Sequence, residues 1–398
     1  MSKPKIRFPQ YADDWRPASL SSIATEINRK ATIGSIAPVM MITAANGFIE
    51  QSQRYSTDNA GSSLVNYTLL RKGELAYNHG YSSLRHYGSC FDLKEDEARI
   101  PFVYHAFKVN VGNPEFWGHY LNCGIFDKQL RTMVASTARM DGLLNISFGT
   151  YTSLNIRIPT EDEQDKIAEY FNKYNTLIEN AQLQIEKLKS LKICHLNRLF
   201  PIGGGKTPPM RLEGFTEEWK EAELGDCFDE RQERSSEGEL LSVTIGNGIM
   251  RFSELNRHDN SSADKSNYKV VCKGDIVYNS MRMWQGASGF SEYNGIVSPA
   301  YTVLIPREGI NSKFFACLFK NPEMINKFRI NSQGMTSDTW NLKYPAFSKI
   351  KIRFPKDPEE QLKIAEYFEN LNEAIRLHEE ELERLKSLKD SCLQGMFV

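Results

Sequence analysis

The sequence predicts a mixed α+β protein built from two globular domains, each followed by a long helix, with pseudo-two-fold internal symmetry. The main observation is a repeat, because Ile167–Phe171 recurs letter for letter as Ile364–Phe368 at an offset of 197 residues. Leu188–Lys192 recurs as Leu385–Lys389 at the same offset. A period of this length is too long for a solenoid and indicates two copies of one domain.

Each copy starts with a globular part of about 150 residues, in which short β-like runs alternate with turn residues. Val39–Thr43 and Tyr301–Ile305 are such runs, and Lys72–Asn78 matches Lys273–Asn279. The stretch 200–209 has three glycines followed by two prolines, which predicts a flexible hinge. The expected boundaries are 1–160 for the first globular domain, 161–200 for its helix, 201–209 for the hinge, 210–357 for the second globular domain and 358–398 for its helix.

Both long helices have apolar residues spaced alternately four and three positions apart, which is the seam of a coiled coil. The seam residues are Ile167, Phe171, Ile178, Ile185 and Leu188 in the first helix, and Ile364, Phe368, Leu371, Ile375, Leu382 and Leu385 in the second. His378 falls on the second seam, where a polar residue is expected to set the register. Glu163-Gln164 recurs as Glu360-Gln361 near the helix starts, where acidic side chains suit the helix dipole. We therefore expect the helices to pair and to hold the two domains at a fixed separation, each helix spanning about 50 Å.

The composition is that of an ordinary globular protein, with 25% charged and 11% aromatic residues. The formal net charge is −1, and the acidity gathers in 358–398, which has ten acidic and five basic residues. The rest of the chain is neutral to mildly basic, which permits DNA binding without demonstrating it. No apolar run reaches the roughly 18 residues of a membrane span, and the first residues lack the apolar core of a signal peptide. Seven scattered cysteines without a C-x-x-C pair argue against zinc and disulfides, and for the reducing cytoplasm.

No pattern in the sequence predicts catalysis. Gly205–Thr207 resembles the end of a P-loop, but the first glycine of that motif is missing and a helix rather than a strand precedes it. Ser298–Tyr301 resembles the tetrapeptide of amino-methyltransferases only superficially, and a β-edge turn is the better interpretation. The seven histidines show no metal-ligand spacing. We expect a chain that is not an enzyme and that binds no metal or cofactor.

Polar loops after predicted strands have the side chains that read base edges and contact phosphates. In the second copy, Ser280–Gly286 contains an Arg and a Gln, which can make bidentate contacts with guanine and adenine. The candidates are Asn78, His79, Arg85, Arg139 and Asn145 in the first copy, and Asn279, Arg282, Trp284, Gln285, Gln333 and Thr336 in the second. Any single one of them can equally be an ordinary loop residue. As groups they are stronger candidates, because the loops differ between two otherwise matching domains.

These motifs together resemble the specificity subunit of Type I restriction–modification systems, over essentially the whole chain. The resemblance rests on Lys273–Gly286, on Gly295–Tyr301, on Glu360–Phe368 and on Leu385–Lys389, of which the last two have first-copy counterparts. The first copy departs from the pattern, because it has no clear equivalent of Met281–Gln285 or of Ser298–Tyr301.

The resemblance implies that each globular part is a target-recognition domain of mixed α/β build that reads a short half-site in the major groove of double-stranded DNA. It implies that the two helices pack antiparallel as a spacer and dock two methyltransferase subunits, to which restriction/motor subunits are added. S-adenosylmethionine, ATP and Mg would then belong to those partners. The implied function is that of a non-catalytic DNA-binding subunit that reads a bipartite, asymmetric target.

Two alternatives stay open at this point. One is a specificity-like subunit that serves another methyltransferase or nuclease arrangement, which neighbouring genes would reveal. The other is a coiled-coil scaffold that binds only proteins, which would show no sequence preference for DNA.

Overall fold

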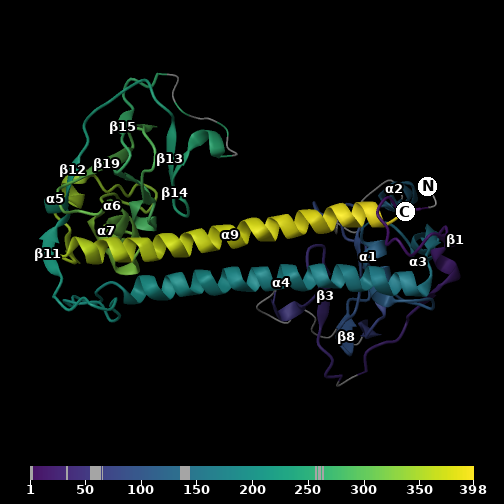
Figure 1. Ribbon diagram of the computed structural model, residues 1–398. Coiled ribbons are helices and arrows are strands. Elements are labelled where there is room, and N and C mark those ends of the chain that lie inside the picture. Colours follow the sequence, from purple (N-terminus) through teal and green to yellow (C-terminus); the bar gives the residue numbers. More distant parts are fainter. Residues whose placement is uncertain are drawn as a thin grey trace. The chain divides into compact units, whose positions relative to one another are not determined.

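The computed structural model describes residues 3–32, 35–53, 64, 66–134, 144–255, 258, 261 and 264–398. The chain divides into two compact units, and each is described by itself (Figure 1). The first unit comprises 1–182 and 380–398, and the second comprises 183–379. Because the boundaries cut through both long helices, each unit contains part of each helix.

The first unit is built on a four-stranded antiparallel sheet of order β2-β9-β6-β7. Three smaller antiparallel pairs accompany it, β1–β10, β3–β4 and β5–β8. The strands are β1 Arg16–Ser19, β2 Ala24–Glu26, β3 Met40–Thr43, β4 Gly47–Glu50, β5 Thr68–Arg71, β6 Leu75–Asn78, β7 Ser89–Asp92, β8 Glu97–Ile100, β9 His105–Val109 and β10 Asn155–Ile158. The helices are α1 Pro114–Leu121, α2 Asp127–Met133, α3 Phe148–Thr152 and α4 Glu161–Arg198, with 3-10 turns at Leu20–Ser22 and Gln51–Gln53.

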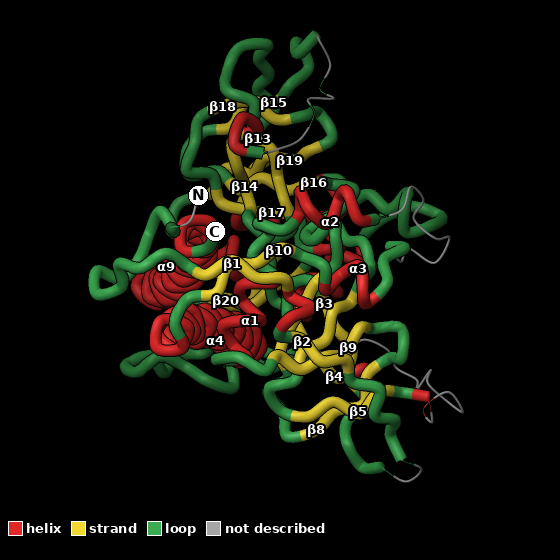
Figure 2. Tube along the Cα trace, turned by 90° about the vertical axis from the view of Figure 1, so that its right-hand side faces the viewer, coloured by secondary structure: helices red, strands yellow, loops and turns green. Residues whose placement is uncertain are grey.

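The second unit repeats this plan strand for strand, with a sheet of order β12-β19-β16-β17 and the pairs β11–β20, β13–β14 and β15–β18. Its strands are β11 Lys220–Glu223, β12 Phe228–Glu230, β13 Leu241–Thr244, β14 Gly248–Arg251, β15 Lys269–Val271, β16 Ile276–Asn279, β17 Ser288–Phe290, β18 Gly295–Val297, β19 Tyr301–Pro306 and β20 Lys351–Phe354. Its helices are α5 Leu224–Cys227, α6 Ser312–Leu318, α7 Pro322–Asn331, α8 Tyr344–Phe347 and α9 Pro358–Met396, with 3-10 turns at Phe252–Glu254 and Met283–Gln285. The strands are short and joined by many loops (Figure 2). The expected mixed fold with internal symmetry is confirmed.

The core of each unit is completed by the end of a long helix that starts in the other half of the chain. In the first unit Phe397, just past α9, stacks on Phe171 of α4 with ring centroids 5.6 Å apart. In the second unit Phe200, just past α4, stacks on Phe368 of α9 at 6.1 Å. All four side chains are buried. The same apolar contact is therefore made twice, each time by residues that are far apart in the sequence.

The repeated Glu-Gln pair at the start of each long helix has a structural reason. The Glu163 carboxylate accepts two hydrogen bonds from the Arg7 guanidinium, at 2.7 and 2.8 Å. The Glu360 carboxylate accepts two from Arg211, both at 2.8 Å. The next residue, Gln164 or Gln361, is fully buried. Its amide nitrogen donates to the carbonyl of the proline that follows the preceding strand, which is Pro159 or Pro355. Its amide oxygen accepts from the backbone N–H of the residue just before α1 or α6. These contacts fix where each long helix leaves its globular part.

The helices α4 and α9 have 38 and 39 residues. In the first unit the Tyr170 hydroxyl lies 3.4 Å from Cys392 Sγ, and the Lys389 ammonium donates to the Asn175 side chain at 2.6 Å. Because the α4 number rises while the α9 number falls, the helices pair antiparallel, as expected. In the second unit the ion pair of Lys189 with Glu379 and the contact of His195 with Tyr367 follow the same order.

The seam residues are not equally buried. Those that are buried are Ile167, Phe171, Ile185, Ile364, Phe368, Leu371, Ile375 and Leu382. Those that are half-buried are Ile178, Leu188 and Leu385. The expectation for His378 is wrong, because its side chain is exposed and cannot set a register inside the pair. A pair of helices, unlike a larger bundle, leaves one edge of its seam open to solvent.

Candidate nucleic-acid interface

The loop after β16 in the second unit is a compact turn that presents one free basic side chain. The side-chain oxygen of Asn279 accepts from the backbone N–H of Met281 at 3.1 Å. The Trp284 indole N–H donates to the Met281 carbonyl at 3.1 Å, and Gly286 closes the turn with a φ of +80°. The Arg282 side chain is exposed at the start of this turn. Asn279 and Trp284 thus shape the loop and leave Arg282 available to a ligand.

A second loop, between α7 and α8, lies against the first. Gln333 and Asn341 exchange two backbone hydrogen bonds, at 3.0 and 2.8 Å, which pinch the segment between them into a projecting loop. Gln333 and Thr336 are exposed on it. Trp340 meets Trp284 edge to face with ring centroids 5.2 Å apart. The two loops therefore present their polar side chains on one surface.

Lys320 connects the first of these loops to neighbouring segments of the second unit. Its ammonium donates to the carbonyls of Gly286 at 2.6 Å, Ser288 at 2.8 Å and Ile245 at 3.1 Å. These three acceptors belong to the end of the turn, to β17 and to the turn between β13 and β14. Burial lowers the pKa of Lys320 to about 8. Sequence reasoning missed this residue, because a lone lysine after a short helix gives no signal of a buried role.

The equivalent loop of the first unit follows β6. Asn78 repeats the role of Asn279, since its oxygen accepts from the N–H of Gly80 at 3.0 Å and its amide donates to the Ile42 carbonyl. The loop contains a small turn in which the Arg85 N–H donates to the Ser82 hydroxyl at 3.0 Å. Arg85 itself is half-buried. Asn145, on the neighbouring segment before α3, is exposed.

The structure divides the DNA-binding candidates into two kinds. Asn78, His79, Asn279 and Trp284 use their polar atoms within the protein, so we now expect them to shape loops rather than to contact DNA. Arg85, Asn145, Arg282, Gln285, Gln333 and Thr336 are exposed or half-buried and stay predicted contacts. Arg139 lies outside the described residues.

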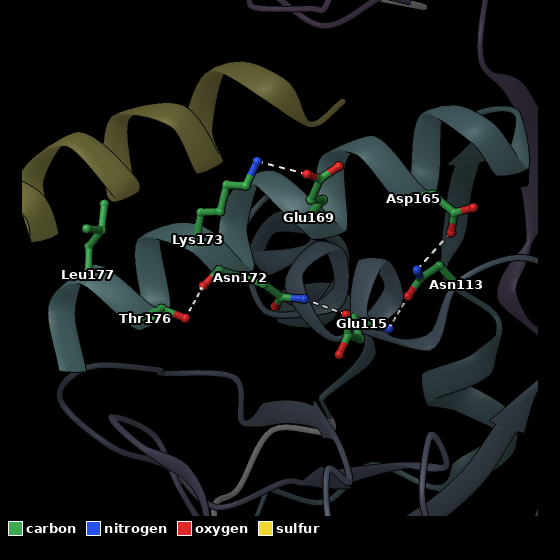
Figure 3. A pocket seen from close by; sticks show the side chains of 8 residues that line it. All are labelled: Asn113, Glu115, Asp165, Glu169, Asn172, Lys173, Thr176 and Leu177. Atoms are coloured by element: carbon green, nitrogen blue, oxygen red, sulfur yellow. Dashed lines mark hydrogen bonds and ion pairs between the residues drawn. The ribbon is translucent and has the colours of Figure 1, made fainter. Parts of the chain in front are cut away.

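A separate groove of about 700 Å³ lies on α1 and the first half of α4 (Figure 3). It is lined by Asn113, Glu115, Asp165, Glu169, Asn172, Lys173, Thr176 and Leu177. The Glu115 carboxylate accepts from the Asn172 amide and from the Lys94 ammonium. Although burial opposes it, these partners lower the pKa of Glu115 below its ordinary value. The groove therefore contains an ionised Glu115 carboxylate that is paired with Lys94, and it also contains Leu177, whose side chain is 50% exposed.

Within the described residues, no group of three or more His, Cys, Asp or Glu side chains is placed to hold a metal ion. In the same part of the chain, no helix is both long enough and apolar enough to span a membrane.

A family model described as the Type I restriction modification DNA specificity domain matches residues 216–387. This range comprises almost all of the second globular part and most of α9. The first half repeats the strand order and the helix motifs of the matched half. Residues 216–387 therefore belong to the Type I restriction modification DNA specificity domains. The role of such a domain is DNA sequence recognition.

Two solved structures share the fold of this chain. The crystal structure of the S subunit of a Type I restriction–modification system from M. genitalium matches 100% of this chain and 99% of its own, with a TM-score of 0.57 and 16% identity. The second structure comes from work on the structural basis of complex assembly and conformational transition of the type I R-M system. One of its chains matches 96% of this chain and 97% of its own. Its TM-score is 0.52, again at 16% identity. At this identity the likeness is one of fold.

Proposed function

We propose that the whole chain is a specificity subunit that reads a bipartite, asymmetric DNA target, with one half-site for each unit. The observation that carries the proposal is that two copies of one fold present different loops at the same place. The loop after β16 exposes Arg282 beside Gln285, whereas the loop after β6 has Arg85 in a different turn. Loops with different donors and acceptors select different bases in the major groove.

The test is selection from a pool of duplexes with a randomised segment of about two helical turns, using the full chain. The expected motif has two unlike halves separated by unspecified base pairs. The double variant Arg282→Ala, Gln285→Ala is expected to lose one half of the motif and to keep the other. A palindromic motif, or loss of both halves together, would contradict the proposal.

We further propose that α4 and α9 set the spacing of the two half-sites. Each of these helices contributes residues to both units, α4 on either side of Gln182 and α9 on either side of Glu379. An α-helix rises 1.5 Å per residue, so a seven-residue insertion adds about 10 Å, or roughly three base pairs of duplex. A heptad insertion also keeps the seam in phase.

Inserting one heptad after Gln182 and one after Glu379 should therefore lengthen the preferred spacer by about three base pairs. As the matched control, seven Gly and Ser residues inserted in the 201–209 segment should leave the spacer unchanged. An unchanged spacer in the helix variant would refute a role of the helices in spacing.

We propose that the groove on α1 and α4 docks a methyltransferase subunit. The groove combines the carboxylates of Glu115 and Glu169 with the exposed side chain of Leu177. A helix with basic and apolar side chains on one face would complement it in charge and in surface. Leu177→Asp should reduce co-purification with the methyltransferase and leave DNA selection intact. Ile202→Asp changes a leucine-sized residue of 52% exposure outside the groove and should retain the partner. Equal recovery with both variants would exclude this groove.

We infer that the chain contributes no chemical step, and that S-adenosylmethionine, ATP and Mg are bound by methyltransferase and restriction subunits. The matched family domain is a DNA specificity domain, which supports this division. All seven cysteines are free thiols, which suits a cytoplasmic complex. Calorimetry of the purified chain with S-adenosylmethionine should show no binding heat. The same titration in the presence of the methyltransferase should show a binding heat.

A further inference from the structure

At the base of the loop that follows β6, two histidines lie face to face. The rings of His79 and His105 have centroids 5.0 Å apart and planes 8° apart. Tyr77 and Tyr151 extend the stack, with their ring centroids 3.9 Å apart. His79 is 7% exposed, so its ring nitrogens must find partners within the protein.

Both ring nitrogens of His79 face backbone carbonyls. Nδ1 lies 2.7 Å from the Leu144 oxygen, and Nε2 lies 2.8 Å from the Val103 oxygen. A carbonyl oxygen can only accept a hydrogen bond, so each nitrogen has to donate. A neutral imidazole has one N–H and can satisfy one of these contacts, whereas an imidazolium has two and satisfies both. The geometry thus fits the doubly protonated ring.

The groups around this ring are compatible with one positive charge. His105 donates through Nε2 to the Ile146 carbonyl at 2.9 Å, which needs a single N–H. Burial lowers the pKa of His105, while Glu26 on β2 acts in the opposite direction. Tyr77 and Tyr151 face the stack with rings whose pKa values burial raises, so both phenols are neutral. A neutral His105 can stack on a charged His79 without repulsion between two cations.

His79 contacts the carbonyl of Leu144 and His105 contacts the carbonyl of Ile146, the two residues on either side of Asn145 in the chain. The backbone reinforces this connection, because the Leu144 N–H donates to the His79 carbonyl at 2.8 Å. The second unit keeps only the backbone part, with Leu342 N–H donating to the Ser280 carbonyl at 2.9 Å. There the side chains at the two histidine positions are Ser280 and Thr302, whose hydroxyls lie 3.1 Å apart. Neither hydroxyl titrates near neutral pH.

We propose that His79 is a positioning residue of the first unit, which as an imidazolium ties the segment around Asn145 to the end of β6. The segment is one of the predicted reading segments, so the inference rests on the proposed function. A side chain with a single N–H at this position would free either Leu144 or Val103. Recognition of the first half-site therefore depends on the His79 ring, whereas the second unit has the uncharged side chains Ser280 and Thr302 at these positions.

The protonation state can be tested without DNA. In the full chain labelled with ¹⁵N-histidine, the His79 ring should show two protonated nitrogens. His79→Gln assigns the signal by removing it, and His378→Gln is the matched control on the exposed face of α9. One unprotonated nitrogen in the His79 ring would overturn the proposal, whatever the DNA results are.

The consequence for recognition is tested with the same selected duplexes. In His79→Gln the preference for the first half-site should fall about tenfold, as for the loss of one charge-assisted hydrogen bond. The preference for the second half-site should stay constant. His378→Gln should keep both preferences. An equal loss at both half-sites in His79→Gln, or no loss at either, would overturn the positioning role, whereas the absence of any two-part motif in the wild-type chain would refute the proposed function instead.

Discussion

Replacing Lys320 with Met removes a half-buried lysine whose ammonium connects three segments of the second unit. The three carbonyl acceptors come from Ile245, Gly286 and Ser288, at 2.6 to 3.1 Å. All three of these hydrogen-bond acceptors are backbone carbonyls, and no carboxylate is among them. Met has a similar length and no charge, and it therefore deletes the donor while filling most of the space.

The magnitude follows from the pKa. Burial lowers the pKa of Lys320 from 10.5 to about 8. Below pH 8 both the folded and the unfolded chain hold this proton, and stability does not change with pH on its account. Between pH 8 and pH 10.5 the unfolded chain holds more protons, so the free energy of unfolding rises with pH. The full rise over this window is about 3 kcal/mol.

The assay is urea unfolding of the second unit, followed at pH values from about 7 to about 10.5. The difference in free energy of unfolding between wild type and Lys320→Met should grow by about 3 kcal/mol across the window. Lys343→Met, on an exposed lysine near the second loop, is the matched control and should show no such growth. In Lys320→Met, hydrogen exchange at Gly286 and Ser288 should also become faster. Parallel pH curves for wild type and Lys320→Met would refute the buried-ammonium reasoning.

Three further predictions concern recognition, anchoring and helix pairing. Arg282→Ala should relax the preference at one base pair by about 1–3 kcal/mol if the contact is bidentate, measured with singly substituted duplexes, and a uniform loss would mark a phosphate contact instead. Glu360→Gln should lower the free energy of unfolding by about 3 kcal/mol in urea, because it leaves the Arg211 charge, of which 15% is exposed, without its carboxylate. Ile185→Ala should cost about 2–4 kcal/mol in the same assay, because this seam side chain is 6% exposed. Leu191→Ala, at 40% exposure, should cost under 1 kcal/mol, and a similar loss for both would contradict the packing.

The candidate site was only partly predictable, and the reason is local. The loops after Asn78 and Asn279 could be placed from the sequence, because each follows a recognisable strand. Which side chains stay free on those loops could not be placed. His79 has the chemistry of a DNA contact in the sequence, yet its ring is satisfied by carbonyls 24 and 65 residues away. No local pattern encodes such partners.

The sequence by itself determined the duplication, the mixed fold and the two long helices. These features depend on local spacing. The pentapeptide Ile167–Phe171 and its copy revealed the duplication, the four-three spacing of apolar residues revealed the helices, and the short β-like runs indicated the mixed fold. Tertiary structure decided which helix ends pack into which core, and which polar side chains form hydrogen bonds within the protein. Phe397 completes a core that contains Trp15, and Lys320 gathers three separate segments. Contacts of this kind join residues that are far apart in the sequence. Such burial depends on the folded chain and not on the spacing of neighbouring residues, so no periodic pattern in the sequence indicates it.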